Sequence, residues 1–198
     1  ALTRACRLTS ADYARRSGEL ARRLYSLAWC GLLPLAFGYL LWRGIRQPAY
    51  RAHWAERLGL AGAPAAGLVP PPLVWIPAVA VAETRVAMPL LEALAARDPQ
   101  QGFLLTHATP TGRETGAELS KRLPGRIVQC YLPYDLPGAV ARFLDRWRPA
   151  CGLLIETEVW PNLAAVCARR QLPLALVNGR LSARSLARGQ RQARLIVP

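Results

Sequence analysis

Three carboxylates of this sequence stand directly after apolar segments, where acidic side chains can take part in proton transfer. Glu83 ends the run "VWIPAVAVAE", and Glu156 and Glu158 follow the run "CGLLI". A glutamate between an apolar strand and the start of a helix can act as a general base, or can do no more than complement the helix dipole. We weigh these two roles of Glu83 equally from spacing alone.

The pair Glu156 and Glu158 could be coupled acids. We expect at most one of the two carboxylates to face a cleft. The other then holds its loop through backbone amides or through Arg180. Asn178 and Arg180 could bind an anion or a hydroxyl group, although a turn residue and a solvated arginine are the interpretation that the residues alone favour.

The segment "TPTGRE", residues 109–114, combines a capping pattern with a possible anion site. Thr111 is expected as the N-cap of a helix, with Glu114 three residues later as the partner in a capping box. Free amides at a helix start, the small residue Gly112 and the nearby Arg113 would also form a site of the size of a phosphate group. Both roles can coexist in one loop.

Short apolar runs alternate with helical patterns from residue 73 onward, which predicts the elements that position these side chains. Strands are expected at Leu73–Val79, Phe103–Thr106, Ile127–Tyr131, Gly152–Ile155 and Leu174–Val177. Helices are expected at Thr84–Arg97, Arg113–Arg122, Pro137–Trp147 and Pro161–Arg170. This alternation predicts an α/β fold, a Rossmann-like parallel sheet with flanking helices. Pro89 conflicts with the first helix, which must start late or kink there.

The carboxyl ends of the predicted strands gather the polar residues at one edge, which is where open parallel sheets bind ligands. The residues that fall there are Glu83, Thr109–Gly112, Tyr134, Asp135, Glu156, Glu158, Asn178 and Arg180. The loops at the opposite edge have the composition of ordinary connections.

The segment Leu24–Trp42 carries no charge and has about the length that an α-helix needs to cross a bilayer. Arginines flank it, and tryptophan and tyrosine supply interfacial rings. Pro34 would bend such a helix, which leaves a membrane span and an interface-lying hairpin open, beside the alternative of a buried core helix. The expected organisation is a tail at 1–23, a membrane-associated helical segment at 24–60, a linker at 61–72 and the Rossmann-like domain at 73–198.

The formal net charge of +14 favours an anionic partner, which could be nucleic acid, a phospholipid surface or a phosphorylated substrate. Arg51, His53, Trp54 and Arg57 form a basic, aromatic stretch that would suit an anionic membrane surface. Five widely spaced cysteines do not form a disulfide pattern, which fits a reducing compartment. His53 and His107 lack neighbouring ligands at metal-binding spacing, and we expect no bound metal and no cofactor.

Several motifs together resemble the N-terminal half of the Kdo transferases. These motifs are "AVAVAETRVAMPLLEAL", "TPTGRE", "YLPYDLPGAVARFLDRWRP", "IETEVWPN" and "NGRLSARS", preceded by "LWRGIRQPAYRAHWAERLG". The family consists of bacterial glycosyltransferases that add 3-deoxy-D-manno-octulosonic acid (Kdo) to a lipid A precursor in lipopolysaccharide biosynthesis. The resemblance covers residues 24–185.

This resemblance implies the acceptor domain of a two-domain GT-B glycosyltransferase at the cytoplasmic face of the cell inner membrane. Glu83 matches the general base that takes a proton from the acceptor hydroxyl, so that the reaction inverts the anomeric carbon without a metal. The residues implied to line the acceptor side are Thr109, Thr111, Gly112, Glu156, Glu158, Asn178 and Arg180. The CMP-Kdo donor would bind a C-terminal domain that we expect to be absent from this chain, which should therefore be inactive alone.

The sequence departs from the family pattern beside the expected base. Pro77, Ala80 and Ala82 replace the usual histidine, serine and glycine, which removes two polar side chains and adds a methyl group where backbone freedom could be needed. Arg113 replaces a serine, and Gly179 replaces an alanine.

Two other function classes compete with the transferase. A non-catalytic basic module that binds membrane or nucleic acid gains from the substitutions near Glu83, but no RNP pattern or helix-turn-helix supports a nucleic-acid partner. A nicotinamide-dependent enzyme would need G-x-G-x-x-G after the first strand, which this sequence does not have there.

Overall fold

A computed structural model describes residues 10–60, 69–155 and 160–177 of the 198-residue chain. Three helical elements precede the sheet: α1 (Ser10–Arg46), the 3-10 helix η1 (Pro48–Arg51) and α2 (Trp54–Arg57). The strands are β1 (Leu73–Pro77), β2 (Gly102–His107), β3 (Ile127–Tyr131), β4 (Cys151–Ile155) and β5 (Leu174–Val177). The helices between them are α3 (Val81–Arg97), α4 (Pro110–Ser120), α5 (Pro137–Trp147) and α6 (Pro161–Arg169).

The five strands form one parallel sheet in the order β3-β2-β1-β4-β5, which confirms the predicted α/β class. The chain moves outward from β1 to β3 and then returns to the other side of β1. The strand order therefore reverses between β1 and β4. In sheets of this kind, ligands bind at the carboxyl edge beside such a reversal.

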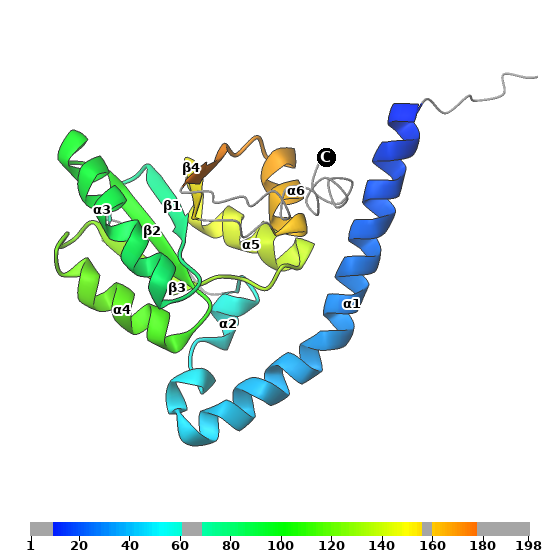
Figure 1. Cartoon of the computed structure of the whole chain (residues 1–198), viewed down its shortest axis with the longest axis horizontal. Coiled ribbons are helices and arrows are strands. Elements are labelled where there is room, and N and C mark those ends of the chain that lie inside the picture. The colour runs from blue at the N-terminus through cyan, green and yellow to red at the C-terminus, as the bar shows by residue number, and fades with distance from the viewer. Residues whose placement is uncertain (1–9, 61–68, 156–159, 178–198) are drawn as a thin grey trace, which may run out of the picture.

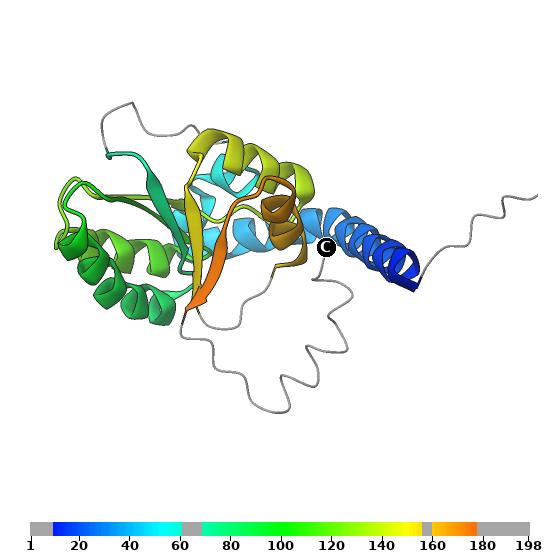
Figure 2. The same cartoon turned by 90° about the horizontal axis from the view of Figure 1, so that it is seen from above.

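Helices cover both faces of the sheet, with α3 and α4 on one face and α5 and α6 on the other (Figures 1 and 2). Ile76, Leu105 and Leu91 belong to the core under α3, and Trp75, Leu104 and Phe143 belong to the core under α5. Because side chains of a strand alternate in direction, each central strand supplies residues to both cores. Trp75 also donates a buried hydrogen bond from Nε1 to Thr106 Oγ1 at 3.0 Å.

The element bounds differ from the predictions mainly at the carboxyl edge. β1 ends at Pro77 rather than Val79, and α3 starts at Val81 rather than Thr84. α3 continues through Pro89, so the prediction that the helix starts late is wrong. Likewise α4 starts at Pro110, where a proline without an amide hydrogen is well tolerated, rather than at Arg113.

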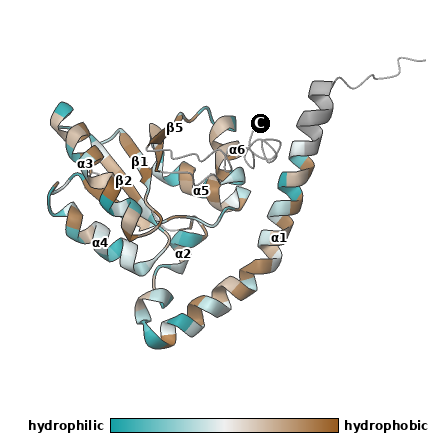
Figure 3. Cartoon of the chain, viewed as in Figure 1, coloured by the Kyte–Doolittle hydropathy of each residue, from teal (hydrophilic) through white to brown (hydrophobic). Residues whose placement is uncertain are grey.

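The apolar segment near the N-terminus is a single long helix rather than a hairpin. α1 starts at Ser10, well before Leu24, and includes Pro34. It changes direction part-way along its length (Figure 1), as a proline within a helix can cause. Residues 18–46 are long and apolar enough to cross a membrane by length and composition, and hydrophobic residues recur along this helix in Figure 3.

α1 presents two opposite faces. Leu40 and Gly44 are buried, and Ser26, Trp29 and Phe37 contact the rest of the chain. At about 100° per residue these positions share one face. The opposite face exposes Leu24 by 59%, Leu27 by 66% and Leu35 by 68%, so the alternative of a buried core helix is wrong.

The short helix α2 packs into the domain rather than facing outward. Arg57 is 4% exposed, donates from Nη1 to Ala108 O at 3.0 Å, and lies 4.0 Å above the ring of Tyr131. The prediction that Arg57 faces an anionic membrane is therefore wrong, whereas Arg51 and His53 are exposed. Gly59 follows with a φ of +68°, and a Cβ there would overlap the carbonyl oxygen of Ala139 on α5.

Candidate active site at the carboxyl edge of the sheet

Glu83 lies in the first turn of α3, directly beyond the carboxyl end of β1. Its side chain is half-buried, and its Oε2 accepts a hydrogen bond from the Ala80 amide at 3.0 Å. The bond fixes the carboxylate at the helix N-terminus, which favours negative charge. Among the described residues, the other oxygen, Oε1, accepts no hydrogen bond. The hydrogen bond to Oε2 therefore orients the Glu83 carboxylate, and Oε1 is left to accept a proton or a hydrogen bond from a ligand.

The loop after β2 packs directly against the loop that carries Glu83. Ala108 donates its amide to Val79 O at 2.9 Å. A Cβ at Gly112 would stand 3.5 Å from both Val79 O and the carbonyl carbon of Ala80. The start of α4 thus lies close to the start of α3. Among the predicted acceptor residues, Thr109 and Gly112 are brought together beside this loop.

Thr109, not Thr111, is the N-cap of α4. The Thr109 hydroxyl accepts the Gly112 amide at 3.1 Å, and Pro110 occupies the first helical position. The predicted capping box of Thr111 and Glu114 is wrong, because Pro110 after Thr109 lets the N-cap fall two residues earlier. Thr111 lies inside the first turn and is exposed.

The anion site predicted at this loop has lost two of its expected donors to internal contacts. The Gly112 amide is used by Thr109, and the Arg113 guanidinium is paired with the carboxylate of Glu56 on α2. Thr111 and Glu114 are exposed in this segment, and the Thr111 hydroxyl could meet a ligand hydroxyl.

Glu56 links α2 to the end of β3 and to α4, and the sequence analysis did not single it out. Its carboxylate is 11% exposed and pairs with Arg113, with His53 Nδ1 at 3.0 Å and with the Tyr131 amide at 2.6 Å. Arg113 also lies 5.0 Å from the centre of the Tyr131 ring. One signal in the sequence could have indicated a structural role for Glu56. It is an acidic residue between His53 and Arg57, and an acidic residue does not suit an anionic membrane surface.

His107 is buried at the end of β2, as a core histidine with satisfied ring nitrogens. Nδ1 lies 3.0 Å from Ala78 O, and Nε2 lies 2.9 Å from the side-chain amide of Gln129. In the amide orientation that satisfies both residues, the Gln129 nitrogen donates to Nε2. Burial lowers the pKa of His107 to about 4, so the ring is neutral at physiological pH.

Asp135 follows β3 and caps α6 instead of lining the cleft. Its carboxylate accepts the amides of Asn162 at 3.1 Å and Leu163 at 2.8 Å. The residue is 1% exposed, and burial raises the pKa of its carboxyl. Tyr134 packs its ring 5.6 Å from that of Trp29 on α1. Both residues thus join the carboxyl edge to neighbouring helices.

The remaining predicted site residues, Glu156, Glu158, Asn178 and Arg180, lie outside the described residues. Their strands are described, and both end at the same edge as β1. β4 pairs directly with β1, with Trp75 opposite Gly152, and β5 pairs with β4, with Ile155 opposite Val177. Ile155 and Val177, the last residues of these two strands, therefore lie at the edge of the sheet that carries Glu83.

Comparison with known proteins identifies the family. A profile of the family "3-Deoxy-D-manno-octulosonic-acid transferase (kdotransferase)" matches residues 52–198. The chain belongs to this family. It is 45% identical over 171 residues to the 3-deoxy-D-manno-octulosonic acid transferase of Bordetella pertussis, covering 84% of this chain and 39% of that protein.

Two further relatives carry the same activity in their names. The probable mitochondrial 3-deoxy-D-manno-octulosonic acid transferase of Arabidopsis thaliana is 31% identical, covering 86% of this chain and 37% of the relative. The enzyme of Haemophilus influenzae is 36% identical, covering 80% of this chain and 36% of the relative. The chain thus spans less than half the length of these relatives.

The family departures near Glu83 have different structural consequences. Ala80 is the N-cap residue of α3 and has no side-chain group that could accept an amide. Ala82 is an exposed residue of the first helical turn, and it is not among the described residues with positive φ. The expectation that its methyl group restricts the backbone is therefore wrong. Pro77 is buried as the last residue of β1.

Proposed function

We propose that this chain is the acceptor-binding part of a Kdo transferase and that Glu83 is its general base. The observation that carries the proposal is the position of Glu83, half-buried at the carboxyl edge, beside the reversal of strand order. The Ala80 amide holds Oε2 at 3.0 Å, which leaves Oε1 to accept the proton of a sugar hydroxyl. Loss of that proton makes the hydroxyl oxygen a nucleophile.

The acceptor would be a phosphorylated lipid A precursor, bound along the same edge. Thr109 and Gly112 shape the loop beside Glu83, and Thr111 exposes a hydroxyl group. Glu156, Glu158, Asn178 and Arg180 complete the proposed acceptor side. The activated sugar, CMP-Kdo, would be held by a second domain, and Kdo would be transferred with inversion.

We further propose that the domain works at the cytoplasmic face of the inner membrane, with α1 lying along the bilayer surface. Ser26, Trp29 and Phe37 contact the domain across the middle of the apolar segment. A helix that spans the bilayer through this segment would carry those domain contacts into the hydrocarbon. The exposed leucines on the opposite face supply the apolar stripe of an interfacial helix.

A chimera tests the role of Glu83. This chain replaces the matching part of the Bordetella pertussis relative, and transfer of Kdo from CMP-Kdo to a lipid A precursor is measured. Glu83→Gln should lower kcat at least about 100-fold, because general base catalysis contributes about that much or more.

The matched control is Glu92→Gln, on the same helix, where the carboxylate is 43% exposed and lies 3.4 Å from Arg122. It should leave kcat within about twofold, as a surface pair of this kind contributes little. Equal rates for Glu83→Gln and the unmodified chimera would refute the proposed base. Absence of saturable binding between the native chain and the lipid A precursor would refute the acceptor role.

A further inference from the structure

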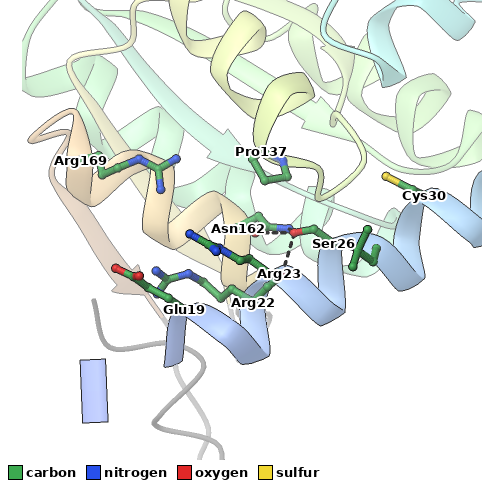
Figure 4. Close-up of a pocket in the computed structure, with 9 residues that line it drawn as sticks. Glu19, Arg22, Arg23, Ser26, Cys30, Pro137, Asn162 and Arg169 are labelled. Carbon is green, nitrogen blue, oxygen red and sulfur yellow. Dashed lines mark hydrogen bonds between the residues drawn. The ribbon is translucent and has the colours of Figure 1, made fainter. Parts of the chain in front are cut away.

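A cavity of about 570 Å³ lies between α1, the start of α5 and α6 (Figure 4). Arg22 and Arg23 reach it from α1 and Arg169 from α6, with Glu19 at one end and Leu27 and Cys30 on the apolar side. Its size is within the range of small-molecule sites. Glu83 does not line this cavity, and α5 and α6 cover the face of the sheet opposite to α3.

The cavity has an excess of positive charge. Three guanidinium groups line it against the single carboxylate of Glu19, and Figure 4 shows the three side chains extending into the space between α1 and α6. Among the described residues, none of the three arginines forms an ion pair. Arginine presents several N–H donors in a planar fork, which suits the oxygens of a phosphate group.

The polar groups of Asn162 and Ser26, which line the cavity between α1 and α6, are already hydrogen-bonded. Asn162 is 3% exposed and donates from Nδ2 to Ser26 Oγ at 3.0 Å and to Asp135 O at 2.6 Å. The first amides of α6 are also occupied, because Asp135 accepts those of Asn162 and Leu163. The arginines, rather than the start of α6, are therefore the groups available to an anion.

The position of the cavity on α1 indicates where the anion would come from. At about 100° per residue, Arg23 lies on the flank of α1 between its domain face and its exposed leucine face. Leu24 and Leu27 are more than half exposed, and Leu27 itself lines the cavity. A ligand with a phosphate group and acyl chains would meet the arginines and the leucines together.

We propose that this cavity binds the phosphate group of a membrane lipid, with the acyl chains along Leu20, Leu24 and Leu27. Cationic groups next to an apolar helix face are typical of sites for anionic lipid head groups. A phosphomonoester is the favoured head group, because its greater charge meets three guanidinium groups. The inference concerns binding by this chain alone and does not depend on the transfer reaction.

Titration of a soluble short-chain phosphatidate into the full-length chain in neutral detergent tests the proposal. Calorimetry should show saturable binding of one molecule, at least about tenfold tighter than for the matching phosphatidylcholine. The double variant Arg23→Gln/Arg169→Gln should weaken phosphatidate binding at least about tenfold. The control Arg97→Gln/Arg146→Gln removes two exposed arginines outside the cavity and should change it less than about twofold.

Alkylation of Cys30 supplies a local readout, because this exposed thiol lines the cavity. Phosphatidate should slow its modification, as measured by peptide mass spectrometry, in the native chain and in Glu83→Gln but not in the double variant. Equal weakening by both double variants would overturn the proposal in favour of diffuse charge. Inorganic phosphate binding as tightly as phosphatidate, or displacement of phosphatidate by single-stranded RNA, would overturn the assignment to a lipid.

Discussion

Replacing Glu56 by alanine should destabilise the fold far more than an ordinary surface substitution. The carboxylate is 11% exposed and serves the Arg113 guanidinium and the Tyr131 amide at once. Tyr131 is 2% exposed, so water cannot readily replace the acceptor that its amide would lose. Removing one partner of a buried ion pair costs about 3–5 kcal/mol. The Arg113 side chain is 25% exposed and can regain some hydration, so we expect about 3 kcal/mol.

Urea unfolding of the full-length chain in detergent, followed by circular dichroism, measures this free energy. Glu56→Gln should fall between the native chain and Glu56→Ala, because an amide oxygen can still accept the Tyr131 amide but carries no charge. Glu118→Ala is the matched control, since Glu118 pairs with Lys121 while both side chains are 70% exposed. It should cost less than about 1 kcal/mol. Equal losses for Glu56→Ala and Glu118→Ala would refute the inference that the Glu56 contacts hold α2 to the sheet.

Three further predictions concern backbone and titration. Ala80→Ser should stabilise the chain by about 1 kcal/mol in the same urea assay, because it supplies the side-chain cap that α3 does not have; no gain would contradict the capping geometry. Gly59→Ala should cost more than Gly125→Ala, since both glycines have positive φ but only Gly59 faces a backbone atom; equal costs would contradict the close approach to α5. Burial lowers the pKa of His107 from 6.5 to about 4, so the ring is neutral in the folded chain. As the pH falls, this histidine takes up a proton in the unfolded chain before it does so in the folded chain. The free energy of unfolding therefore decreases between pH 6.5 and pH 4. Over that interval the native chain should lose about 3 kcal/mol more than His107→Gln, and parallel stability curves for the two would contradict the burial of a neutral ring.

The sheet was predictable because apolar runs and helical periodicity repeat in a regular order. Local signals were less reliable where two interpretations shared the same residues. Thr111 with Glu114 matched a capping box, but Pro110 made Thr109, two residues earlier, the N-cap. Sequence spacing also placed Asp135 at the correct edge, yet only the fold shows that its carboxylate caps α6.

The role of α2 could not be predicted, because its contacts join residues that are far apart in the sequence. Glu56 reaches Tyr131 and Arg113, and Arg57 reaches Ala108. No periodic pattern within "HWAERLG" encodes these partners. Composition instead suggested a membrane contact, which the burial of Arg57 contradicts.

The docking of α2 determines where the chain can be cut without loss of its folded state. A fragment that begins at β1 would leave behind the acid that satisfies Tyr131 and the guanidinium that covers its ring. Tyr134 would also lose its hydrogen bond to Arg57 O. Recombinant versions that omit α1 should therefore start before Pro48, so that η1 and α2 remain with the sheet.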